Sequence, residues 1–322
     1  MPLPLISAAI SYVASLGTWW ITVVAANLSS WPAARVHFVA GPAGIVLSFI
    51  VVGLALSIYY QKFARYRVML AVSLIGAVTI SLSWSIVDQL RYQQFAGKWD
   101  VVNCDVGQGD ALVIQSAGVT ALVDVGREPE PIDRCLENLG VDQIDLLVIT
   151  HFDADHAGGI RGALRNRQVS RAIISGFEDD RPLVSLIDQE LNSANVLVYQ
   201  GFAGMSGSLG DLQWKVLSPT ANAWEANDSN DASVIISFVG ADFSVLALGD
   251  LGEVGQQRLL RNSAAALREL TRKPLLLKVA HHGSADQSVE LFRVLGPEVA
   301  IFSVGRNPYG HPTNKALTMA RN

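Results

Sequence analysis

The stretch Thr150-His-Phe-Asp-Ala-Asp-His156 decides the fold of this chain. It directly follows Leu146–Ile149, an apolar run of the kind found in buried strands. Four side chains that can bind a metal ion follow this strand within six positions: His151, Asp153, Asp155 and His156. In an extended backbone alternate residues share one side, so His156 points away from the other three. This spacing suits two neighbouring metal ions better than one, whereas a helix-capping turn explains either aspartate but not both histidines.

Two more candidate ligand motifs lie further along the chain, each at the end of an expected strand. Leu248-Gly249-Asp250 is the first, although an isolated aspartate at this place is more typical of a turn. His281-His282 is the second and is followed by Gly283-Ser284. Two adjacent histidines are difficult to explain by packing alone, because buried neighbours need partners on opposite sides. Together the three motifs predict a metal site built from strand ends.

From Trp99 onward, short β-rich runs alternate with helical patterns. The expected strands are Trp99–Val106, Ala111–Gln115, Thr120–Val125, Ile144–Thr150, Ala172–Ser175, Val196–Tyr199, Gln213–Leu217, Ser233–Val239, Phe243–Leu248, Leu275–Ala280 and Val299–Ser303. The expected helices are Ile132–Leu139, Gly159–Asn166, Val254–Leu270 and Val289–Leu295, and the expected long loops are Gly201–Gly210 and Ala221–Asp231. Strands that pair locally and then alternate with helices predict two packed sheets with helices outside.

The overall composition excludes several classes of protein. The chain has 322 residues, of which 50% are hydrophobic and 16% are charged, with a formal net charge of −5. Disorder, a coiled coil and a basic tail that coats nucleic acid are therefore excluded. The two cysteines, Cys104 and Cys135, are too few and too far apart in the sequence to predict a disulfide scaffold or a thiolate zinc site.

Apolar residues are concentrated in residues 1–96, whereas residues 97–322 have the polarity of a soluble domain. Ala43–Tyr60 and Val68–Val87 are each long enough to cross a hydrocarbon core of about 30 Å as a helix. Leu5–Asn27 either crosses the core or lies at its interface. We therefore expect two or three transmembrane or interfacial helices. The alternative is a set of buried helices in a soluble protein.

Basic residues between the second and third segments predict the orientation of the chain in the cell membrane. Lys62, Arg65 and Arg67 form this short loop, and the positive-inside rule places it in the cytoplasm. The third segment then delivers residues 97–322 to the outside. The sequence therefore predicts a multi-pass membrane protein with an extracytoplasmic C-terminal domain.

Six motifs in order resemble the extracytoplasmic domain of the ComEC family, the bacterial channels for uptake of transforming DNA. They are Asp105-Val-Gly-Gln-Gly-Asp110, Leu122-Val-Asp-Val-Gly126, Thr150–His156, Asn230-Asp-Ala-Ser233, His281-His-Gly-Ser284 and Tyr309-Gly-His-Pro312. The ligand motifs also resemble those of the metallo-β-lactamase superfamily, which implies an α/β sandwich with αββα layers over residues 97–322. Residues 1–96 resemble the tail of the family's membrane competence domain.

The resemblance implies a centre with two divalent metal ions. The implied ligands are His151 and Asp153 for the first metal, Asp155, His156 and either His281 or His282 for the second, and Asp250 as the bridge between them. His282 is the favoured member of its pair, and Asp155 and Asp250 are implied to be catalytic. The superfamily usually has histidines in place of Asp153 and near Asn230-Asp231, and the ComEC pattern shares both substitutions. With three carboxylates, Mn²⁺ or Mg²⁺ is favoured over Zn²⁺, which remains an alternative.

Other residues in these motifs are candidates for orienting the ligands or contacting the substrate. Asp124 resembles the aspartate that orients metal ligands in the superfamily. Gly107 and Gly109 allow a close backbone approach, so that loop amides can meet a phosphate; the alternative is a plain hairpin turn. The remaining candidates are Asp105, Gln108, Asp110, Asn230, Asp231, Ser284 and His311.

The implied function is that of a membrane-tethered, metal-dependent nuclease that cleaves incoming DNA, expected to be single-stranded, outside the membrane. Its implied partners are DNA, the lipid bilayer and the remaining part of the channel. Since the sequence carries only a small part of the family's membrane region, we expect a truncated or split form of the channel protein.

The negative net charge is unusual for a protein that binds DNA, because phosphates are normally contacted by Lys and Arg. Arg161, Arg165 and Arg167 are candidate phosphate contacts, although an exposed helix face explains them better. Two alternative functions stay open. One is hydrolysis of a small ester, lactone or phosphate on the same scaffold, and the other is a non-enzymatic component of a DNA-uptake channel.

Overall fold

The protein divides into two compact units, residues 1–92 and 93–322. A computed structural model describes residues 99–220, 226 and 228–321 of the chain. Of the first unit it describes residues 15, 18–24, 50–53, 66, 68–69, 71–73, 75–76 and 79. The two units are considered separately below.

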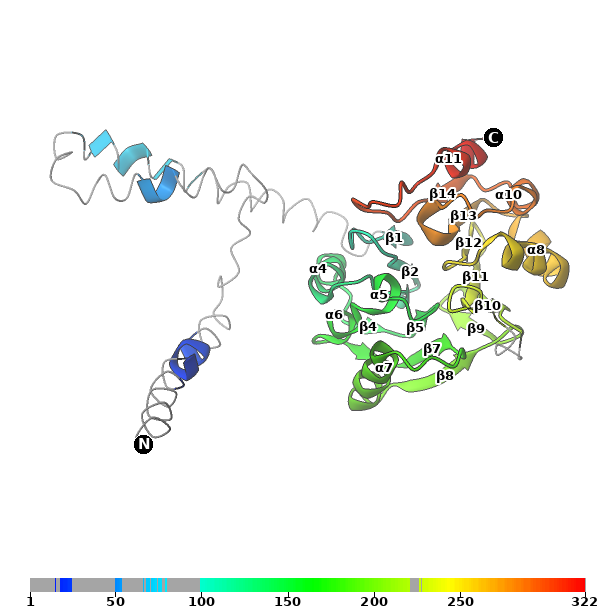
Figure 1. Ribbon diagram of the computed structural model, residues 1–322, viewed down its shortest axis with the longest axis horizontal. Coiled ribbons are helices and arrows are strands. Elements are labelled where there is room, and N and C mark those ends of the chain that lie inside the picture. The colour runs from blue at the N-terminus through cyan, green and yellow to red at the C-terminus, as the bar shows by residue number, and fades with distance from the viewer. Residues whose placement is uncertain are drawn as a thin grey trace, which may run out of the picture. The chain divides into compact units, whose positions relative to one another are not determined.

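Short helical pieces make up what is described of the first unit, including residues 18–24 and 50–53 (Figure 1). No helix among the described residues is both long and apolar enough to cross a membrane. Most of the three predicted segments, Leu5–Asn27, Ala43–Tyr60 and Val68–Val87, lies outside the described residues. The membrane prediction therefore stays a prediction.

Two six-stranded sheets form the middle of the second unit. The first has the order β1 (Val101–Asn103), β2 (Leu112–Ser116), β3 (Val119–Val123), β5 (Leu146–Ile149), β7 (Arg171–Ser175) and β8 (Leu197–Gly201). The second has the order β14 (Val299–Ile301), β13 (Leu275–Lys278), β12 (Ser244–Ala247), β11 (Ile235–Val239), β10 (Leu212–Ser218) and β9 (Ser206–Leu209). A separate small ladder pairs β4 (Gln143–Ile144) with β6 (Gln168–Val169).

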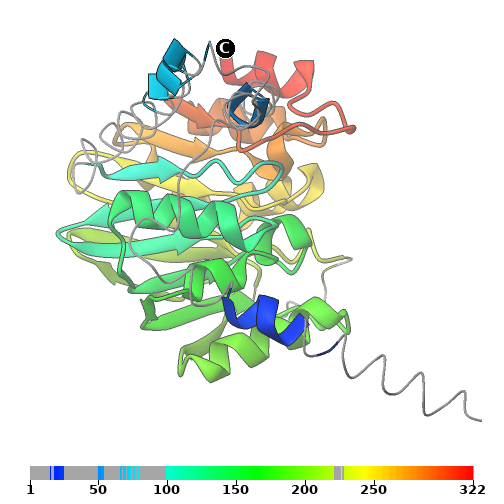
Figure 2. The same cartoon turned by 90° about the vertical axis from the view of Figure 1, so that its left-hand side faces the viewer.

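Helices cover the outer face of each sheet (Figures 1 and 2). The helices beside the first sheet are α4 (Pro129–Leu139), α5 (Ala154–Ala157), α6 (Ile160–Leu164) and α7 (Pro182–Ser193). Those beside the second sheet are α8 (Glu253–Asn262), α9 (Ala264–Leu270), α10 (Val289–Leu295) and α11 (Asn314–Arg321). The αββα sandwich predicted from the sequence is confirmed.

The alternation of side chains along each strand builds three apolar layers. On β3, Leu122 packs with the helices of the first sheet, whereas Ala121 and Val123 face the second sheet. On β12, Val245 faces the first sheet and Leu246 packs with the helices outside the second. Successive side chains of a strand point to opposite faces, so a strand buried on both sides must be apolar throughout.

Parallel pairing brings chemically active residues to the same ends of the two sheets. β3 runs parallel to β5, and β12 runs parallel to β13. The chain therefore leaves these strands at Asp124, Thr150, Leu248 and Val279, respectively. Each predicted ligand motif begins within three residues of such a strand end.

Two expected elements differ from the structure. The helix expected over Val254–Leu270 is interrupted at Ser263, whose backbone leaves the helical region and whose hydroxyl donates to the Leu217 carbonyl at 3.2 Å. The loop expected over Gly201–Gly210 contains β9, which forms a hairpin with β10. There Gly207 leaves space for the Trp214 ring, since a Cβ atom would lie 2.7 Å from that ring. Both differences depend on contacts with strand β10, which the local periodicity of the sequence does not reveal.

Three helices, α5, α7 and α11, were not anticipated. A signal for α7 was present, because Pro182 stands at its first turn and Leu183, Ile187 and Leu191 follow at helical spacing. These side chains pack into the layer between the first sheet and its helices.

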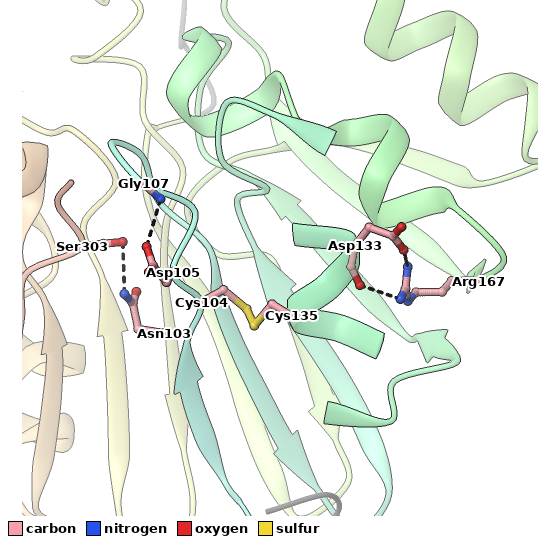
Figure 3. Close-up of a disulfide and its surroundings, with 8 residues drawn as sticks. All are labelled: Asn103, Cys104, Asp105, Gly107, Asp133, Cys135, Arg167 and Ser303. Carbon is pink, nitrogen blue, oxygen red and sulfur yellow. Dashed lines mark hydrogen bonds and ion pairs between the residues drawn. A yellow bond between two sulfur atoms is a disulfide. The ribbon is translucent and has the colours of Figure 1, made fainter. Parts of the chain in front are cut away.

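Cys104 and Cys135 form a disulfide, contrary to the expectation from their spacing (Figure 3). Cys104 follows β1 and Cys135 lies on α4, and their Cα atoms are 5.9 Å apart despite a sequence separation of 31. Packing of α4 against the first sheet brings them together, and sequence distance alone could not show this. The bond ties α4 to the start of the loop that runs from Asp105 to Asp110.

We expect the double substitution C104S/C135S to lower the free energy of unfolding by about 2–4 kcal/mol, because the unfolded chain loses a cross-link. Urea denaturation of the oxidised protein and of the variant measures the difference. The reduced wild-type protein is the control and should unfold like the variant. Equal midpoints for the oxidised protein and the variant would contradict this expectation.

Candidate metal centre

Imidazoles and carboxylates from several strand ends converge at one point in the second unit. Nε2 of His156 lies 3.0 Å from Oδ1 of Asp250, and Nε2 of His151 lies 3.8 Å from Oδ2 of the same carboxylate. These three residues form a group able to hold a metal ion, with ligand atoms all within 4.8 Å of one another. Asp250 thus lies between two histidines that come from a different sheet.

The other candidate ligands surround this group. Nε2 of His282 lies 3.3 Å from Oδ2 of Asp155 and 3.9 Å from Oδ2 of Asp250. Oδ2 of Asp153 lies 3.8 Å from Nε2 of His151. His281 approaches Asp250 as well, with 3.8 Å between its Nε2 and Oδ2 of the aspartate. The structure therefore brings together all seven predicted ligands, and their individual roles stay predictions.

The donor atoms fit divalent cations. Nε2 of His151, His156 and His282 and Oδ1 of Asp250 are buried and satisfied by no hydrogen bond of normal geometry among the described residues. Each unsatisfied buried polar atom costs about 1–3 kcal/mol. A cluster of such atoms is therefore expected only where another group, such as a metal ion, engages them. Imidazole nitrogens and carboxylate oxygens are suitable ligands for divalent metals.

Unusual backbone conformations orient the side chains of two motifs, Gly249-Asp250 and His281-His282. Gly249 has a φ of +49°, and a Cβ atom there would lie 3.0 Å from Ser233. The chain at Gly249 can therefore lie close to Ser233, just before β11, and the backbone N–H of Asp250 donates to Oγ of Ser233 at 3.2 Å. His281 and His282 have φ values of 48° and 54°, which are uncommon for residues other than glycine. The turn buries His282 and leaves the side chain of His281 34% exposed.

Asp124 orients His151 and His156 through contacts on the Nδ1 side of the two rings. One carboxylate oxygen accepts the backbone N–H of Thr150 at 2.8 Å. The other accepts the Thr150 hydroxyl at 2.8 Å and lies 2.9 Å from Nδ1 of His156. Oγ1 of Thr150 also lies 3.0 Å from Nδ1 of His151. With Nδ1 of each ring engaged in this way, Nε2 is directed toward Asp250.

Asp110 and Lys278 form a buried ion pair next to the cluster. Oδ1 of Asp110 lies 3.1 Å from Nδ1 of His282. Asp110 follows Gly109, where a Cβ atom would lie 2.3 Å from the carbonyl oxygen of Asp155. The N–H of Asp110 donates to that same carbonyl at 3.0 Å. The expectation that this loop amide meets a phosphate is therefore wrong for Asp110, because α5 already occupies it.

The carboxylates and imidazoles shift each other's pKa values. Burial alone would lower the pKa of His282, but the nearby carboxylates of Asp110 and Asp155 outweigh it and raise the pKa to about 9. Burial would raise the pKa of Asp155, but its close contact with His282 and the positive charges of His156 and His282 lower it to about 2.

The pKa values of His151 and His156 shift in opposite directions. For His156, the carboxylates of Asp250 and Asp124 overcome burial and raise the pKa well above its usual value. For His151, burial and the neighbouring charge on His156 lower the pKa. In the absence of metal, protons on His156 and His282 therefore balance the carboxylates.

Several other predicted residues support the surrounding loops. The carboxylate of Asp105 accepts the N–H of Gly107 at 3.2 Å, and Oε1 of Gln108 accepts the N–H of Gly305 at 3.3 Å. Oγ of Ser284 accepts the N–H of Asp286 at 3.2 Å. These contacts indicate structural roles for Asp105, Gln108 and Ser284.

The motif Asn230-Asp231 and His311 lie in two further loops. Asp231 pairs with Arg258 on α8 at 3.3 Å, and the carbonyl of Asn230 accepts the N–H of Ser233 at 3.1 Å. The ring of His311 lies closer to the cluster, with its centroid 5.6 Å from that of His281. His311 is therefore placed at the edge of the centre, beside the exposed member of the histidine pair.

Three basic residues at the centre were missed by sequence reasoning. Arg181 reaches Oδ1 of Asp153 at 2.7 Å, and Arg127 lies 4.0 Å from Oδ2 of Asp155. Lys278 was also missed, although a lysine at the end of the apolar strand β13 was a visible signal. The arginines singled out from the sequence have other partners, since Arg161 pairs with Glu190 and Arg165 pairs with Asp133.

A family model and several curated proteins are similar to this chain. Residues 104–181 match the model of the metallo-β-lactamase superfamily. The chain is 28% identical over 251 residues to ComE operon protein 3 of Bacillus subtilis (strain 168). This match covers 71% of this chain and 31% of that protein. It is 25% identical over 224 residues to competence protein ComA of Neisseria gonorrhoeae, covering 67% of this chain and 29% of that protein. The resemblance to the C-terminal part of ComEC-family proteins is confirmed.

A third relative is recombination protein 2 of Haemophilus influenzae, 29% identical over 225 residues, with 66% of this chain and 25% of that protein covered. This ComEC-like chain thus spans less than a third of the length of these relatives.

Among solved structures, the metallo-β-lactamase fold protein YhfI of Bacillus subtilis is similar at a TM-score of 0.45 and 11% identity, covering 69% of this chain and 91% of that one. A diphosphatase of the PhnP family is similar at a TM-score of 0.41 and 15% identity, covering 65% and 77%. The fold assignment rests on the sheet order and the family match.

We expect metal binding to release at least one proton per chain at pH 7. The folded-state pKa of His282 lies above its ordinary value, so its proton stabilises the metal-free fold below about pH 6.5, and this contribution is lost as the pH rises through about 9. Binding a metal through Nε2 displaces that proton. Calorimetric titration with Mn²⁺ in two buffers of different ionisation enthalpy measures the release. Identical apparent enthalpies in both buffers would rule it out.

Proposed function

We propose that this chain is a metal-dependent nuclease that hydrolyses phosphodiester bonds of DNA, preferably single-stranded, during uptake of transforming DNA. The observation that carries the proposal is the convergence of His151, His156 and His282 on Asp250, with unsatisfied nitrogens facing one another. The metallo-β-lactamase fold supports a metal-dependent hydrolase. The names of the relatives, a ComE operon protein and a competence protein, support a role in DNA uptake.

The proposed ligands divide between two positions. His151 and Asp153 belong to one, and Asp155, His156 and His282 belong to the other, with Asp250 shared and His281 close to the substrate. Two divalent cations, when bound, activate water and stabilise charge on the oxygens of a phosphodiester. Three carboxylates favour Mn²⁺ or Mg²⁺, with Zn²⁺ as the alternative.

Two exposed arginines next to the ligands support a phosphate-containing substrate. Arg127 and Arg181 have side chains that are 49% and 43% exposed. Each lies beside a carboxylate assigned to a different metal, Asp155 for Arg127 and Asp153 for Arg181. Arginine recognises phosphate oxygens well because its planar group offers several donors. Local basic residues thus offset the unfavourable net charge of the chain, −5.

We also propose that this domain lies outside the cell membrane and is tethered to it by helices within residues 1–96, which contact the lipid bilayer. The disulfide between Cys104 and Cys135 supports this location, because disulfides persist in oxidising compartments and are rare in the cytosol. The remaining part of a channel is the proposed protein partner.

A second candidate is hydrolysis of a small ester, lactone or phosphate. The acidic net charge favours it, because a small substrate needs no extended basic surface. A non-enzymatic role is less well supported, since a purely structural protein has no need for a cluster of unsatisfied ligand atoms around Asp250.

We expect D250A to lower DNA cleavage by the purified full-length chain at least about 100-fold, because Asp250 is the shared ligand and its loss exceeds the ~10–100-fold effect of outer partners. Cleavage of single-stranded DNA and of small esters is assayed with Mn²⁺, Mg²⁺ or Zn²⁺. D211N, in the exposed turn between β9 and β10, is the control and should keep wild-type activity. Ester turnover without DNA cleavage would favour the second candidate, and no metal uptake would refute both.

We expect R127A to weaken binding of single-stranded DNA and to reduce the slope of log affinity against log salt by about 0.7, the value for one phosphate contact. Fluorescence anisotropy with a phosphorothioate strand measures the slope. R161A is the matched control, because Arg161 pairs with Glu190 on the outer helices. A slope equal to that of the wild type would remove Arg127 from the DNA site.

A further inference from the structure

Lys278 is a buried cation that the proposed chemistry leaves without a role. It is the last residue of β13 and is only 2% exposed. Its ammonium group pairs with Oδ2 of Asp110 and donates a hydrogen bond to the Val279 carbonyl at 2.8 Å. Lysine is rarely buried completely unless it is paired. Since an apolar residue would pack more easily at this strand end, the position of the charge requires a reason.

The partner of Lys278 lies directly behind a candidate ligand. Oδ1 of Asp110 is 3.1 Å from Nδ1 of His282, and the Ser303 carbonyl oxygen is 2.8 Å from the same nitrogen. Both neighbours of Nδ1 are acceptors, so this nitrogen carries the hydrogen. Nε2 then faces Asp155 and Asp250, and its lone pair becomes available to a metal ion once its proton is displaced. A carboxylate behind the ring also increases the basicity of the ligand nitrogen.

Asp110, His156 and His282 form a second group with ligand atoms within 4.8 Å of one another. The ring atoms that face Asp110 are both Nδ1, and each already has another partner. Nδ1 of His156 lies 2.9 Å from Asp124, and Nδ1 of His282 lies 2.8 Å from the Ser303 carbonyl. Neither ring nitrogen that faces Asp110 is therefore free for a metal ion, and Lys278 pairs directly with this carboxylate.

The charges around the centre make this cation important. Five carboxylates surround the cluster, those of Asp110, Asp124, Asp153, Asp155 and Asp250. Two divalent ions would offset four negative charges, Arg181 pairs with Asp153 at the exposed side, and Lys278 is the cation paired with the buried Asp110. Uncompensated charge is costly in a buried site, because little solvent is present to screen it.

We propose that Lys278 is a positioning residue of the metal centre: it holds Asp110 as an anion against His282 and so keeps Nε2 of His282 directed at the metal. The inference rests on the proposed two-metal function. A purely structural ion pair would instead contribute to folding alone, and replacing such a pair by apolar residues is often neutral for stability.

The test uses the full-length chain, stripped of metal by a chelator, and the double variant K278M/D110L. This variant leaves no buried charge unpaired, so its thermal unfolding should stay close to that of the wild type. Its affinity for Mn²⁺ at one of two sites, measured by calorimetric titration, should fall about 10–100-fold. The electron paramagnetic resonance signal of the coupled Mn²⁺ pair should be lost at concentrations that saturate the wild type. Two sites of wild-type affinity would overturn the inference.

A matched control comes from another ion pair of low exposure. Arg167 pairs at 2.8 Å with Asp133 of α4, and the two side chains are 6% and 11% exposed (Figure 3). The variant R167M/D133L should leave both Mn²⁺ sites unchanged. An equal loss of affinity in this control would show a general effect of lost ion pairs and overturn the inference.

A single substitution covers the case in which the double variant fails to fold. K278Q keeps a hydrogen-bond donor for Asp110 and removes only the charge. We expect it to weaken one Mn²⁺ site, and unchanged affinity would overturn the inference. The wild-type titration separates this outcome from failure of the proposed function, because a wild-type chain that binds no metal refutes the two-metal centre itself.

Discussion

The buried carboxylate of Asp124 is the interaction on which the rest of the metal centre depends. It follows β3 in a left-handed backbone conformation, with a φ of 60°. From there it accepts the N–H and the hydroxyl of Thr150 and contacts Nδ1 of His156. One side chain thereby joins the end of β3, the end of β5 and the start of α5. A carboxylate held by several short hydrogen bonds has a fixed position, so the ligand histidines keep one orientation.

Compensation of buried charge is the second constraint on this site. Acidic side chains are gathered between two sheets, where an unpaired carboxylate would destabilise the fold. Three of these carboxylates each have a cationic partner. Lys278 pairs with Asp110, Arg181 pairs with Asp153, and protonated His282 lies against Asp155. Two metal ions would replace the protons on the histidines. The same arrangement thus serves stability without metal and chemistry with metal, which makes metal loading and proton release parts of one equilibrium.

The outer parts of the domain show why some elements could be predicted and others could not. The apolar strands β5 and β12 are buried on both faces, so their continuous hydrophobic runs identified them. β9 has mostly exposed or half-exposed residues, and its pairing with β10 depends on Gly207 leaving room for Trp214. The break at Ser263 likewise depends on a carbonyl from β10. Local periodicity contains no information about such contacts.

The sequence by itself determined the fold class and the candidate ligands. His151, Asp153, Asp155 and His156 are close in the chain, and a strand end presents neighbouring side chains together whatever the rest of the fold does. Only the tertiary structure decided which distant groups face them. The disulfide of Cys104, the pairing of Lys278 with Asp110 and the contact of Arg181 with Asp153 all join residues from separate elements. Packing of helices and sheets sets these distances, and separation along the chain does not.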